Sequence, residues 1–367
     1  MSHITGILLI DAPASALNNA GKDTEARTDN AVAVKFIRTP GGNRMPYVSA
    51  QALRYWVRTQ LASTQGWSSS PVFRETKVAY TDADPVTYDE DDLFGYMRAA
   101  SKGGDEKKAA KRAEIAARST PVDSKVGEVT RISPFRVGTL VSTHPVRIVT
   151  DFGTMARAEG DPVPHEHQFY RAHLKAPFAV DLTAAGTFFV SSRVGFKNLD
   201  SKRIERAQAK GCQELTVRGL SAWRLPLPVR RQRVAALVRA LGRIEGGAKQ
   251  TLHLTDTAPS ILVLAVCRNG NQPLQRLFTA DELEEHTVLR LDVLEENLRS
   301  FGPDLESDIY FGWARGFLDG ERARLEKFLG ERKAEDRPII RLGHPREMAD
   351  AFAQDLTNSE VAEKWFQ

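Results

Sequence analysis

The apolar run from Ile4 to Ile10 constrains the fold more than any other feature of this sequence. Its residues are nearly all aliphatic, and the turn-forming residues Asp11, Ala12 and Pro13 follow directly. The run is far shorter than the ~20 residues that a membrane helix needs. A short continuous apolar run of this kind is typical of a strand that is buried on both faces. We therefore expect this segment to lie inside a covered sheet.

Two amphipathic helices are predicted downstream of this strand. Residues 49–63 repeat apolar side chains at four-residue steps, with Ser49 as a plausible N-cap, and residues 228–244 carry a second apolar stripe that ends before Gly246 and Gly247. Strand-like segments lie between the two helices and after the second. The order strand, helix, strands, helix, strand favours an α+β fold with a ferredoxin-like or RRM-like βαββαβ core.

Two further segments carry distinct patterns. Residues 70–128 are turn-rich and highly charged, acidic from Asp82 to Asp92 and mixed from Arg98 to Arg118, which predicts an insertion that projects from the core. Residues 279–299 are expected to form a helix, because Thr279 and Glu282 have the spacing of a capping box.

Composition limits the class of protein. The 367 residues are 41% hydrophobic and 27% charged, with a formal net charge of +4. This excess of positive charge is only a weak indication of a polyanionic partner. The two cysteines, Cys212 and Cys267, are too few for a disulfide framework or a four-cysteine zinc site. With no signal peptide and no membrane span recognisable, we expect a soluble cytoplasmic protein with no membrane partner.

The start of the first predicted helix has the chemistry of a phosphate site. Free backbone N–H groups and the helix dipole attract anions at a helix N-terminus, where Ser49 and Gln51 lie. Arg54 and Arg58 follow one turn apart, so they can bracket a phosphate. The alternative is an ordinary amphipathic helix with a solvated basic face.

Several stretches together resemble one known family. They are residues 4–19, the helix start with Ser49, Gln51, Leu53, Arg54 and Arg58, Asp151-Phe152-Gly153, residues 162–171 and residues 246–250. The chain resembles the Cas seven-type backbone subunit (RAMP superfamily) of type I CRISPR Cascade complexes, specifically the DevR-like branch of subtype I-B. The likeness spans roughly residues 4–270, and residues after Asn271 add little to it.

The resemblance implies a hand-like organisation. An RRM-like palm would begin with residues 1–78, inserted fingers would occupy residues 79–130, and residues 131–185 would hold a palm strand with a thumb-like excursion between Gly138 and Lys175. Residues 186–367 would complete the palm and add C-terminal helices. Met155 is the candidate for a thumb residue that wedges between bases; packing within a loop is its alternative role.

The resemblance also implies a function without catalysis. The chain would polymerise head-to-tail along a guide RNA (crRNA), hold its phosphates, and kink it for base pairing with target DNA, in antiviral defence or in RNA-guided transposition. Its expected partners are the crRNA, target DNA, further copies of itself, handle-binding and large PAM-reading subunits, a small subunit, and a helicase-nuclease or transposition protein. The expected RNA-binding residues are Asn18, Asn19, Lys35, Arg38, Arg44, Ser49, Gln51, Arg54, Arg58, Arg171, Lys249 and Gln250.

Two enzymatic alternatives stay open. In related type III subunits a loop aspartate cuts target RNA, and Asp29 lies in the comparable loop. His165 and His167 alternate along a strand-like segment and invite a metal-dependent hydrolase, although no His-Glu-x-x-His helix or cysteine cluster accompanies them. We expect no catalytic residue, metal or cofactor, and expect the histidines to contact RNA or a neighbouring subunit.

Two motif-like stretches do not meet the requirements of their motifs. Asp151-Phe152-Gly153 lacks the catalytic loop that precedes the kinase magnesium motif. Residues 242–250 resemble a phosphate loop, but Ala248 separates Gly247 from Lys249, and no hydroxyl residue follows the lysine. Lys249 and Gln250 can still approach a backbone phosphate; a helix C-cap followed by a loop is the alternative.

Overall fold

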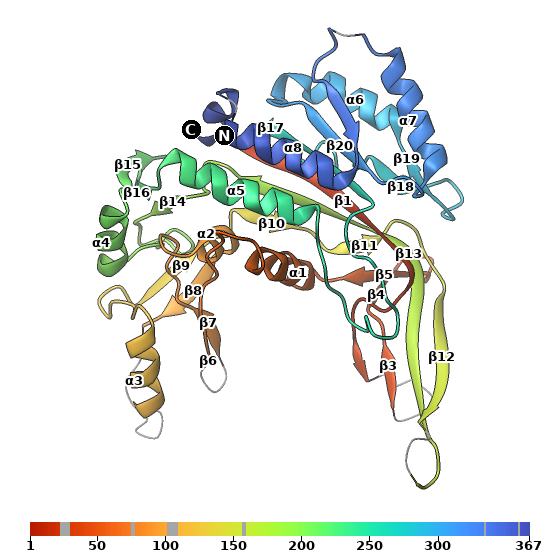
Figure 1. The fold of residues 1–367 in the computed structure, drawn as a ribbon, viewed down its shortest axis with the longest axis horizontal. Helices are drawn as coiled ribbons and strands as arrows, with labels where there is room; N and C mark the ends of the chain where they lie inside the picture. Colours follow the sequence, from red (N-terminus) through yellow and green to blue (C-terminus); the bar gives the residue numbers. More distant parts are fainter. Residues whose placement is uncertain (23–29, 75–77, 101–108, 156–158, 334, 359) are drawn as a thin grey trace.

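The computed structural model describes the chain except residues 23–29, 75–77, 101–108, 156–158, 334 and 359. Its centre is a mixed sheet in which β1 (Ser2–Ser15) lies between β13 (Val163–Asp181) and β17 (Ile261–Arg268). Both neighbours run antiparallel to β1. Figure 1 shows this sheet with the long β13 continuing beyond it. No helix among the described residues is long and apolar enough to cross a membrane.

The predicted βαββαβ core is confirmed. Along the chain, β1 is followed by α1 (Ala50–Ala62), then by β10 (Phe135–Val137) and β11 (Leu140–Ser142), which both pair with β13. The helix α5 (Leu227–Leu241) comes next and leads to β17. The strand order β17-β1-β13-β11 is the order of a ferredoxin-like sheet, in which each helix crosses over an intervening strand.

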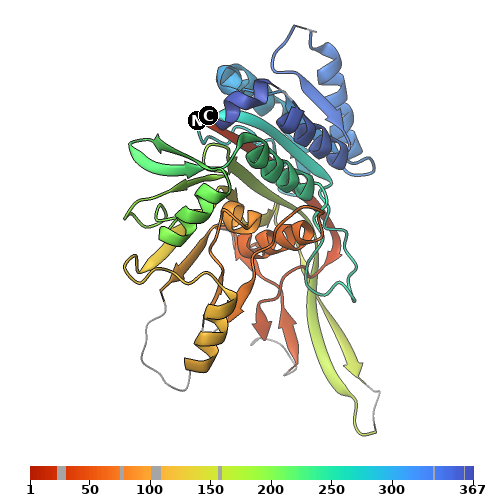
Figure 2. The same ribbon diagram turned by 60° about the vertical axis from the view of Figure 1, so that its left-hand side comes forward.

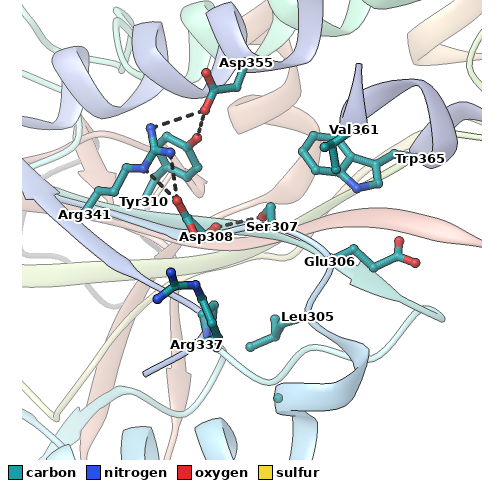
Figure 3. A pocket seen from close by; sticks show the side chains of 12 residues that line it. Leu305, Glu306, Ser307, Asp308, Tyr310, Arg337, Arg341, Asp355, Val361 and Trp365 are labelled. Atoms are coloured by element: carbon teal, nitrogen blue, oxygen red, sulfur yellow. Dashed lines mark hydrogen bonds and ion pairs between the residues drawn. The ribbon is translucent and has the colours of Figure 1, made fainter. Parts of the chain in front are cut away.

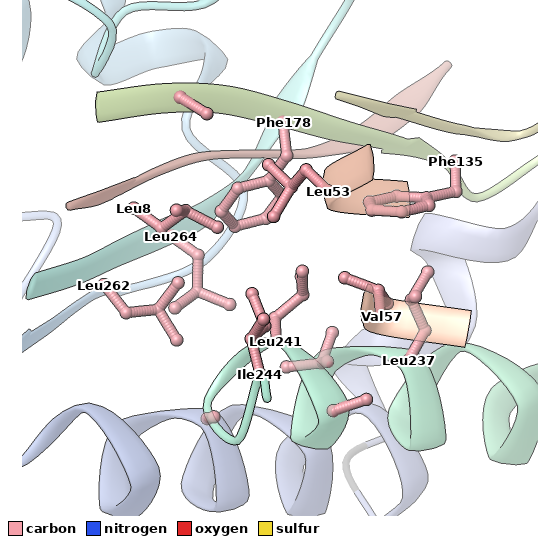
Figure 4. Close-up of a cluster of buried hydrophobic side chains, with 14 of the residues drawn as sticks. Leu8, Leu53, Val57, Phe135, Phe178, Leu237, Leu241, Ile244, Leu262 and Leu264 are labelled. Carbon is pink, nitrogen blue, oxygen red and sulfur yellow. The ribbon is translucent and has the colours of Figure 1, made fainter. Parts of the chain in front are cut away.

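The strand β1 is buried on both faces, as its composition predicts. Ile4, Leu8 and Ile10 belong to a core formed with α1, α5 and α8 (Pro345–Asn358), whereas Ile7 and Leu9 belong to a second core. Figure 4 shows the first core, where Leu8, Leu262 and Leu264 of the sheet face Leu53 and Val57 of α1 and Leu237 and Leu241 of α5. Alternation along a strand thus supplies two separate layers.

The far edge of the sheet carries a C-terminal extension. It consists of β20 (Ile309–Trp313), β21 (Ile340–Gly343), the hairpin of β18 (Phe278–Ala280) and β19 (Thr287–Leu289), and the helices α6 (Leu291–Phe301) and α7 (Asp319–Glu331). Residues of this extension form the second core. The expected helix over residues 279–299 is therefore wrong in its first half. Thr287 and Leu289 are buried at strand spacing, so tertiary burial of alternate residues outweighs the capping-box signal.

Two groups of elements form the charged insertion and the region between β13 and α5. The insertion contains β6 (Val72–Arg74), β7 (Ala79–Thr81), α2 (Asp89–Phe94), β8 (Tyr96–Ala99), α3 (Ala109–Arg118) and β9 (Glu128–Arg131). Beside it lie β14 (Thr187–Phe189), α4 (Ser201–Ala209), β15 (Gln213–Val217) and β16 (Leu220–Arg224). The hairpin β6–β7 crosses the expected boundary at residue 78.

A two-stranded ribbon forms the other projection. The strand β12 (Ile148–Met155) pairs with the first half of β13 in unbroken register from Met155–Val163 to Ile148–Tyr170. It lies within the segment expected to hold a thumb. Shorter strands flank its root: β2 (Gly21–Lys22), β3 (Ala31–Ala33), β4 (Phe36–Arg38) and β5 (Arg44–Val48). In both Figure 1 and Figure 2 the ribbon and the charged insertion project from the same side of the palm.

Candidate nucleic-acid interface

The helix α1 begins where the sequence predicts. Ser49 has an extended backbone and its Oγ accepts from the backbone N–H of Ala52 at 3.3 Å, which makes it the N-cap. The first turn carries no acidic side chain, so nothing on it neutralises the positive end of the helix dipole. Gln51 is exposed on this turn. The helix start thus keeps the anion-attracting geometry expected of it.

Arg54 does not face solvent as expected. Its Nη1 donates to the carbonyl of Phe135 at 2.6 Å and to Ser133 Oγ at 3.2 Å, and its Nη2 donates to the carbonyl of Phe94 at 2.7 Å. Burial, together with the charge of Arg58, lowers the pKa of Arg54 to about 10. These hydrogen bonds fasten α1 to α2 and β10, and the expected phosphate contact of Arg54 stays a prediction.

Arg58 is also engaged within the protein. Its Nε lies 2.9 Å from Glu90 Oε1, and its guanidinium lies 4.9 Å from the centroid of the Phe94 ring. Burial raises the pKa of Glu90, and the charge of Arg58 opposes that rise. Internal acceptors thus engage both side chains of the expected phosphate bracket, which stays a prediction.

A different arginine pair lies unneutralised at the edge of the sheet. Arg38 and Arg44 oppose each other across the β4–β5 ladder. Their guanidiniums lie 5.2 and 4.8 Å from the centroid of the same Phe36 ring. Within the described chain neither has a carboxylate partner, and Arg38 has only a long 3.5 Å contact to the Gly42 carbonyl. Like charges held directly opposite each other destabilise a strand pair, so an anion would stabilise this hairpin.

The end of β1 connects this hairpin to the palm. Asn18 is buried, and its Oδ1 accepts from the backbone N–H of Lys35 at 3.0 Å. Asn19 Oδ1 accepts from the backbone N–H of Gly21 at 2.7 Å. Both asparagine oxygens therefore shape the local backbone. Lys35 is half-buried and its ammonium has no ion pair within the described chain.

The loop after α5 packs against the same region. A side chain at Gly246 would collide with Trp56 of α1 at 2.4 Å, and Gly247 adopts a φ of +106°, so both positions need glycine. Gln250 donates from Nε2 to the carbonyl of Gly246 and accepts at Oε1 from the backbone N–H of Thr255. These two hydrogen bonds close the loop, and the expected RNA contact of Gln250 stays a prediction.

Lys249 is held at the surface of this loop. It has a positive φ of 57° and is half-buried, and no ion pair involves its ammonium within the described chain. Burial chiefly lowers the pKa of His167, and the positive charges of His253 and Lys249 lower it further, against the opposing effect of Asp151. The Lys249 carbonyl accepts from the backbone N–H of His253 at 2.8 Å, so Lys249 lies beside the rings that follow along β13.

Aromatic and imidazole rings line one face of the ribbon, at alternate positions of β13 from His165 to Phe169. The rings of His165 and His167 lie 6.4 Å apart with planes 16° from parallel. His253 of the loop lies 5.1 Å from His167 and 5.1 Å from Phe169. No group of three or more His, Cys, Asp or Glu side chains among the described residues is placed to hold a metal ion. The geometry thus gives no support to the metal-dependent alternative at His165 and His167.

Three other expected residues lie elsewhere. Arg171 is exposed beside His173, whose pKa is lowered by burial first and by the charges of His144 and Arg171 next, against the effect of Asp11. Met155 ends β12 near the far end of the ribbon and is 59% exposed. Asp29, the candidate RNA-cutting residue, lies outside the described part of the chain.

One buried cluster has the composition of a hydrolytic triad but not its access. His173 Nδ1 lies 2.8 Å from Thr287 Oγ1, and its Nε2 lies 3.8 Å from Asp11 Oδ1. Thr287 is only 2% exposed, and its hydroxyl also contacts Thr143 at 2.6 Å. A hydroxyl buried in this way cannot meet a substrate, so the cluster fastens the β18–β19 hairpin onto the sheet.

A hollow of about 360 Å³ lies away from these residues, beside β20, β21 and the end of α8. Arg341 pairs with Asp308 at 2.8 Å and with Asp355 at 3.3 Å, and the Tyr310 hydroxyl donates to Asp355, as Figure 3 shows. Glu306 and Arg337 also line it. The hollow therefore carries more carboxylates than guanidiniums, which does not suit a polyanion.

The structure adds residues that the motifs did not reveal. Phe36 holds the arginine pair, and His253 completes the ring cluster. The arginine pair has a sequence signal, because Arg38 and Arg44 are placed symmetrically about the Pro40-Gly41-Gly42 turn of a hairpin. His253 has none, since only the path of the loop brings it to β13.

Comparisons with known proteins complete the description. No family model matches the chain, and no curated protein matches it. Two solved structures are similar in trace, each with a TM-score of 0.48. One, a chain of a "CRISPR RNA-guided surveillance complex", is 14% identical, with 96% of this chain and 98% of that chain covered. The other, from a "CRISPR RNA-guided surveillance complex, pre-nicking", is 13% identical, with 96% and 99% covered. Identities this low do not transfer a function.

Proposed function

We propose that this chain is a guide-RNA-binding backbone subunit of a type I CRISPR surveillance complex, with no catalytic role. One observation carries the proposal. Four cations without carboxylate partners in the described chain, Lys35, Arg38, Arg44 and Lys249, lie in segments near the start of α1, whereas Arg58 of α1 pairs with Glu90 and Arg98 of the insertion pairs with Asp82. Unneutralised cations beside a helix N-terminus suit a phosphate chain.

Such a surface binds RNA through its phosphates. Guanidinium and ammonium groups contact phosphate oxygens whatever the base, so the grip is independent of sequence. Base pairing between guide and target then supplies sequence recognition. This division of labour fits a subunit that repeats along a guide, because each copy meets a different stretch of sequence.

The projections support a repeated assembly. A two-stranded ribbon such as β12–β13 is marginally stable when isolated in water, and this one exposes Phe152 by 61% and Met155 by 59%. A neighbouring copy that takes up the ribbon in a head-to-tail arrangement would cover these side chains. The resemblance of residues 4–270 to subtype I-B backbone subunits supports the same assembly, with the other Cascade subunits, the target DNA and an effector as further partners.

The test is RNA binding by paired charge variants. Arg38→Gln with Arg44→Gln should weaken binding of unrelated single-stranded RNA sequences about tenfold or more at low salt. The slope of log affinity against log salt should fall by about one to two units. Lys202→Gln with Lys210→Gln, two exposed cations of α4 and its C-cap, is the matched control and should leave both quantities unchanged.

Three outcomes would overturn the proposal. Protein co-expressed with its guide array should purify with small RNA of one defined length, and recovery free of nucleic acid would contradict it. An equal loss of RNA affinity in the Lys202 and Lys210 control variant would show that RNA is attracted by the overall positive charge and not by a specific site. Regular cuts in complementary RNA with Mg²⁺, abolished by Asp29→Ala, would replace it with the RNA-cutting alternative.

A further inference from the structure

The ring cluster along one face of the β12–β13 ribbon has the geometry of a stacking surface. The planes of His165 and His167 are within 16° of parallel at 6.4 Å, so a flat group that lies parallel to one ring lies parallel to both. His165 is exposed, whereas Phe169 and His253 are half-buried behind His167. The exposed ring of His165 is thus followed by three packed rings. A flat group that stacks here meets a surface that is already rigid, so little side-chain entropy is lost on binding.

A glycine sets the position of the exposed ring. Gly153 lies directly opposite His165 in the ladder, and a Cβ at Gly153 would come within 2.7 Å of His165 Nε2 and 2.8 Å of His165 Cε1. The imidazole therefore lies across the neighbouring strand in space that any other residue would fill. Cross-strand packing of this kind fixes the ring orientation without a hydrogen bond.

The charges around the platform favour a nucleotide. The Lys249 carbonyl accepts from the backbone N–H of His253 at 2.8 Å, so the segment that carries a cation for a phosphate adjoins the ring surface for a base. Asp151 lies directly opposite His167 in the ladder, and its Oδ2 is 3.6 Å from His167 Nε2. Bases of single-stranded nucleic acid stack on aromatic and imidazole rings whatever their identity.

We infer that His165 and His167, backed by Phe169 and His253 and set by Gly153, form a stacking site for a nucleobase of the bound RNA strand. This inference rests on the proposed function, because it names how one base, and not only the phosphates, is held. Part of the RNA affinity should therefore depend on the presence of a base and should come from these rings, separately from the phosphate contacts of Arg38 and Arg44.

The experiment separates bases from phosphates. The full chain is titrated at pH 8, above the ordinary imidazole pKa of about 6.5, with a single-stranded RNA oligonucleotide and with an abasic oligonucleotide of equal length. Wild-type protein should prefer the intact strand about tenfold. His165→Ala with His167→Ala should remove most of that preference and leave the salt slope unchanged. His165→Phe with His167→Phe should restore it.

Gly153→Ala provides a variant that keeps both rings but displaces one. It should reduce the preference for the intact strand, and its thermal unfolding midpoint reports separately whether the ribbon is still folded. An unchanged preference in the double alanine variant, with its salt slope also unchanged, would overturn the stacking site while the proposed function stands. Failure of the wild-type protein to bind either strand would overturn both.

Discussion

The arginines of the insertion and those of the β4–β5 hairpin are the same residue type in opposite electrostatic settings. At the junction of the insertion with the palm, buried guanidiniums each meet a carboxylate; these are Arg98 with Asp82, Arg131 and Arg233 with Asp92, and Arg203 with Asp200. Arg38 and Arg44 meet only Phe36, each other and a long carbonyl contact. Internal acceptors, either carboxylates or the carbonyls that Arg54 meets, engage the structural arginines, whereas Arg38 and Arg44 have no comparable acceptors among the described residues.

The difference has an energetic meaning. Removal of a buried guanidinium leaves its carboxylate charged and unpaired, which typically costs several kcal/mol. Removal of an exposed cation that has no partner costs the folded chain little and removes a repulsion where two cations face each other. Stability and RNA affinity should therefore respond to different arginines, and four substitutions in the protein test this separation.

The largest expected effect is at Arg203. Its guanidinium is fully buried and donates to Asp200 and to the carbonyls of Ala83, Asp82 and Thr120. Arg203→Met should lower the free energy of unfolding by about 3–5 kcal/mol, measured by urea denaturation. The neighbouring Lys202→Met is the control and should change it by less than about 0.5 kcal/mol. A loss below 1 kcal/mol at Arg203 would break the comparison.

The second effect concerns Asp91, an acid of the junction that has no ion pair among the described residues. Asp91 is buried, its Oδ2 accepts from Ser70 and the backbone of Asp84, and burial raises its pKa to about 6. A raised pKa means that ionised Asp91 destabilises the fold at higher pH. Asp91→Asn should therefore stabilise the protein on the order of 2 kcal/mol at pH 8, by urea denaturation, and the gain should vanish below about pH 4. A loss of stability at pH 8 would contradict this.

Arg54 tests whether an arginine near the helix start belongs to the structural set. Arg54→Ala should cost about 2 kcal/mol of unfolding free energy, because three acceptors lose a charged donor. RNA affinity of the folded fraction should change by less than about twofold. Equal RNA affinity losses in Arg54→Ala and in the Arg38 and Arg44 variants would return Arg54 to the RNA-binding set.

The smallest effect is the response of His173 to acid. Burial lowers its pKa, with His144 and Arg171 adding to the effect and Asp11 opposing it, so protonation favours the unfolded chain. Neutral His173 makes its full contribution to the free energy of unfolding above about pH 6.5, the ordinary imidazole pKa. That contribution falls as the pH drops through and below this value, because the unfolded chain then binds the proton more tightly. His173→Gln should flatten the stability profile below pH 6.5. A profile that keeps its full slope would assign the acid sensitivity to other groups.

Local patterns in the sequence predict the core well. The βαββαβ order, the doubly buried strand from Ile4 to Ile10 and the N-cap at Ser49 all follow from the periodicity of apolar side chains and from capping chemistry. The first half of the expected helix over residues 279–299 was wrong, because a hairpin buried on the sheet competes with local propensity. Local patterns thus predict the helices and strands of the core, except where burial of a segment against the sheet outweighs its local propensity.

The sequence alone determined which cations the chain carries and near which predicted element each falls. Only the tertiary structure decided which of them are neutralised. Arg58 meets Glu90, and Arg203 meets carbonyls some 120 residues away, whereas Arg38 and Arg44 meet no acid within the described chain. Periodicity is a short-range property of the chain, but charge pairing depends on which distant segments fold side by side, and this is why the arginines could be counted from the sequence but not assigned.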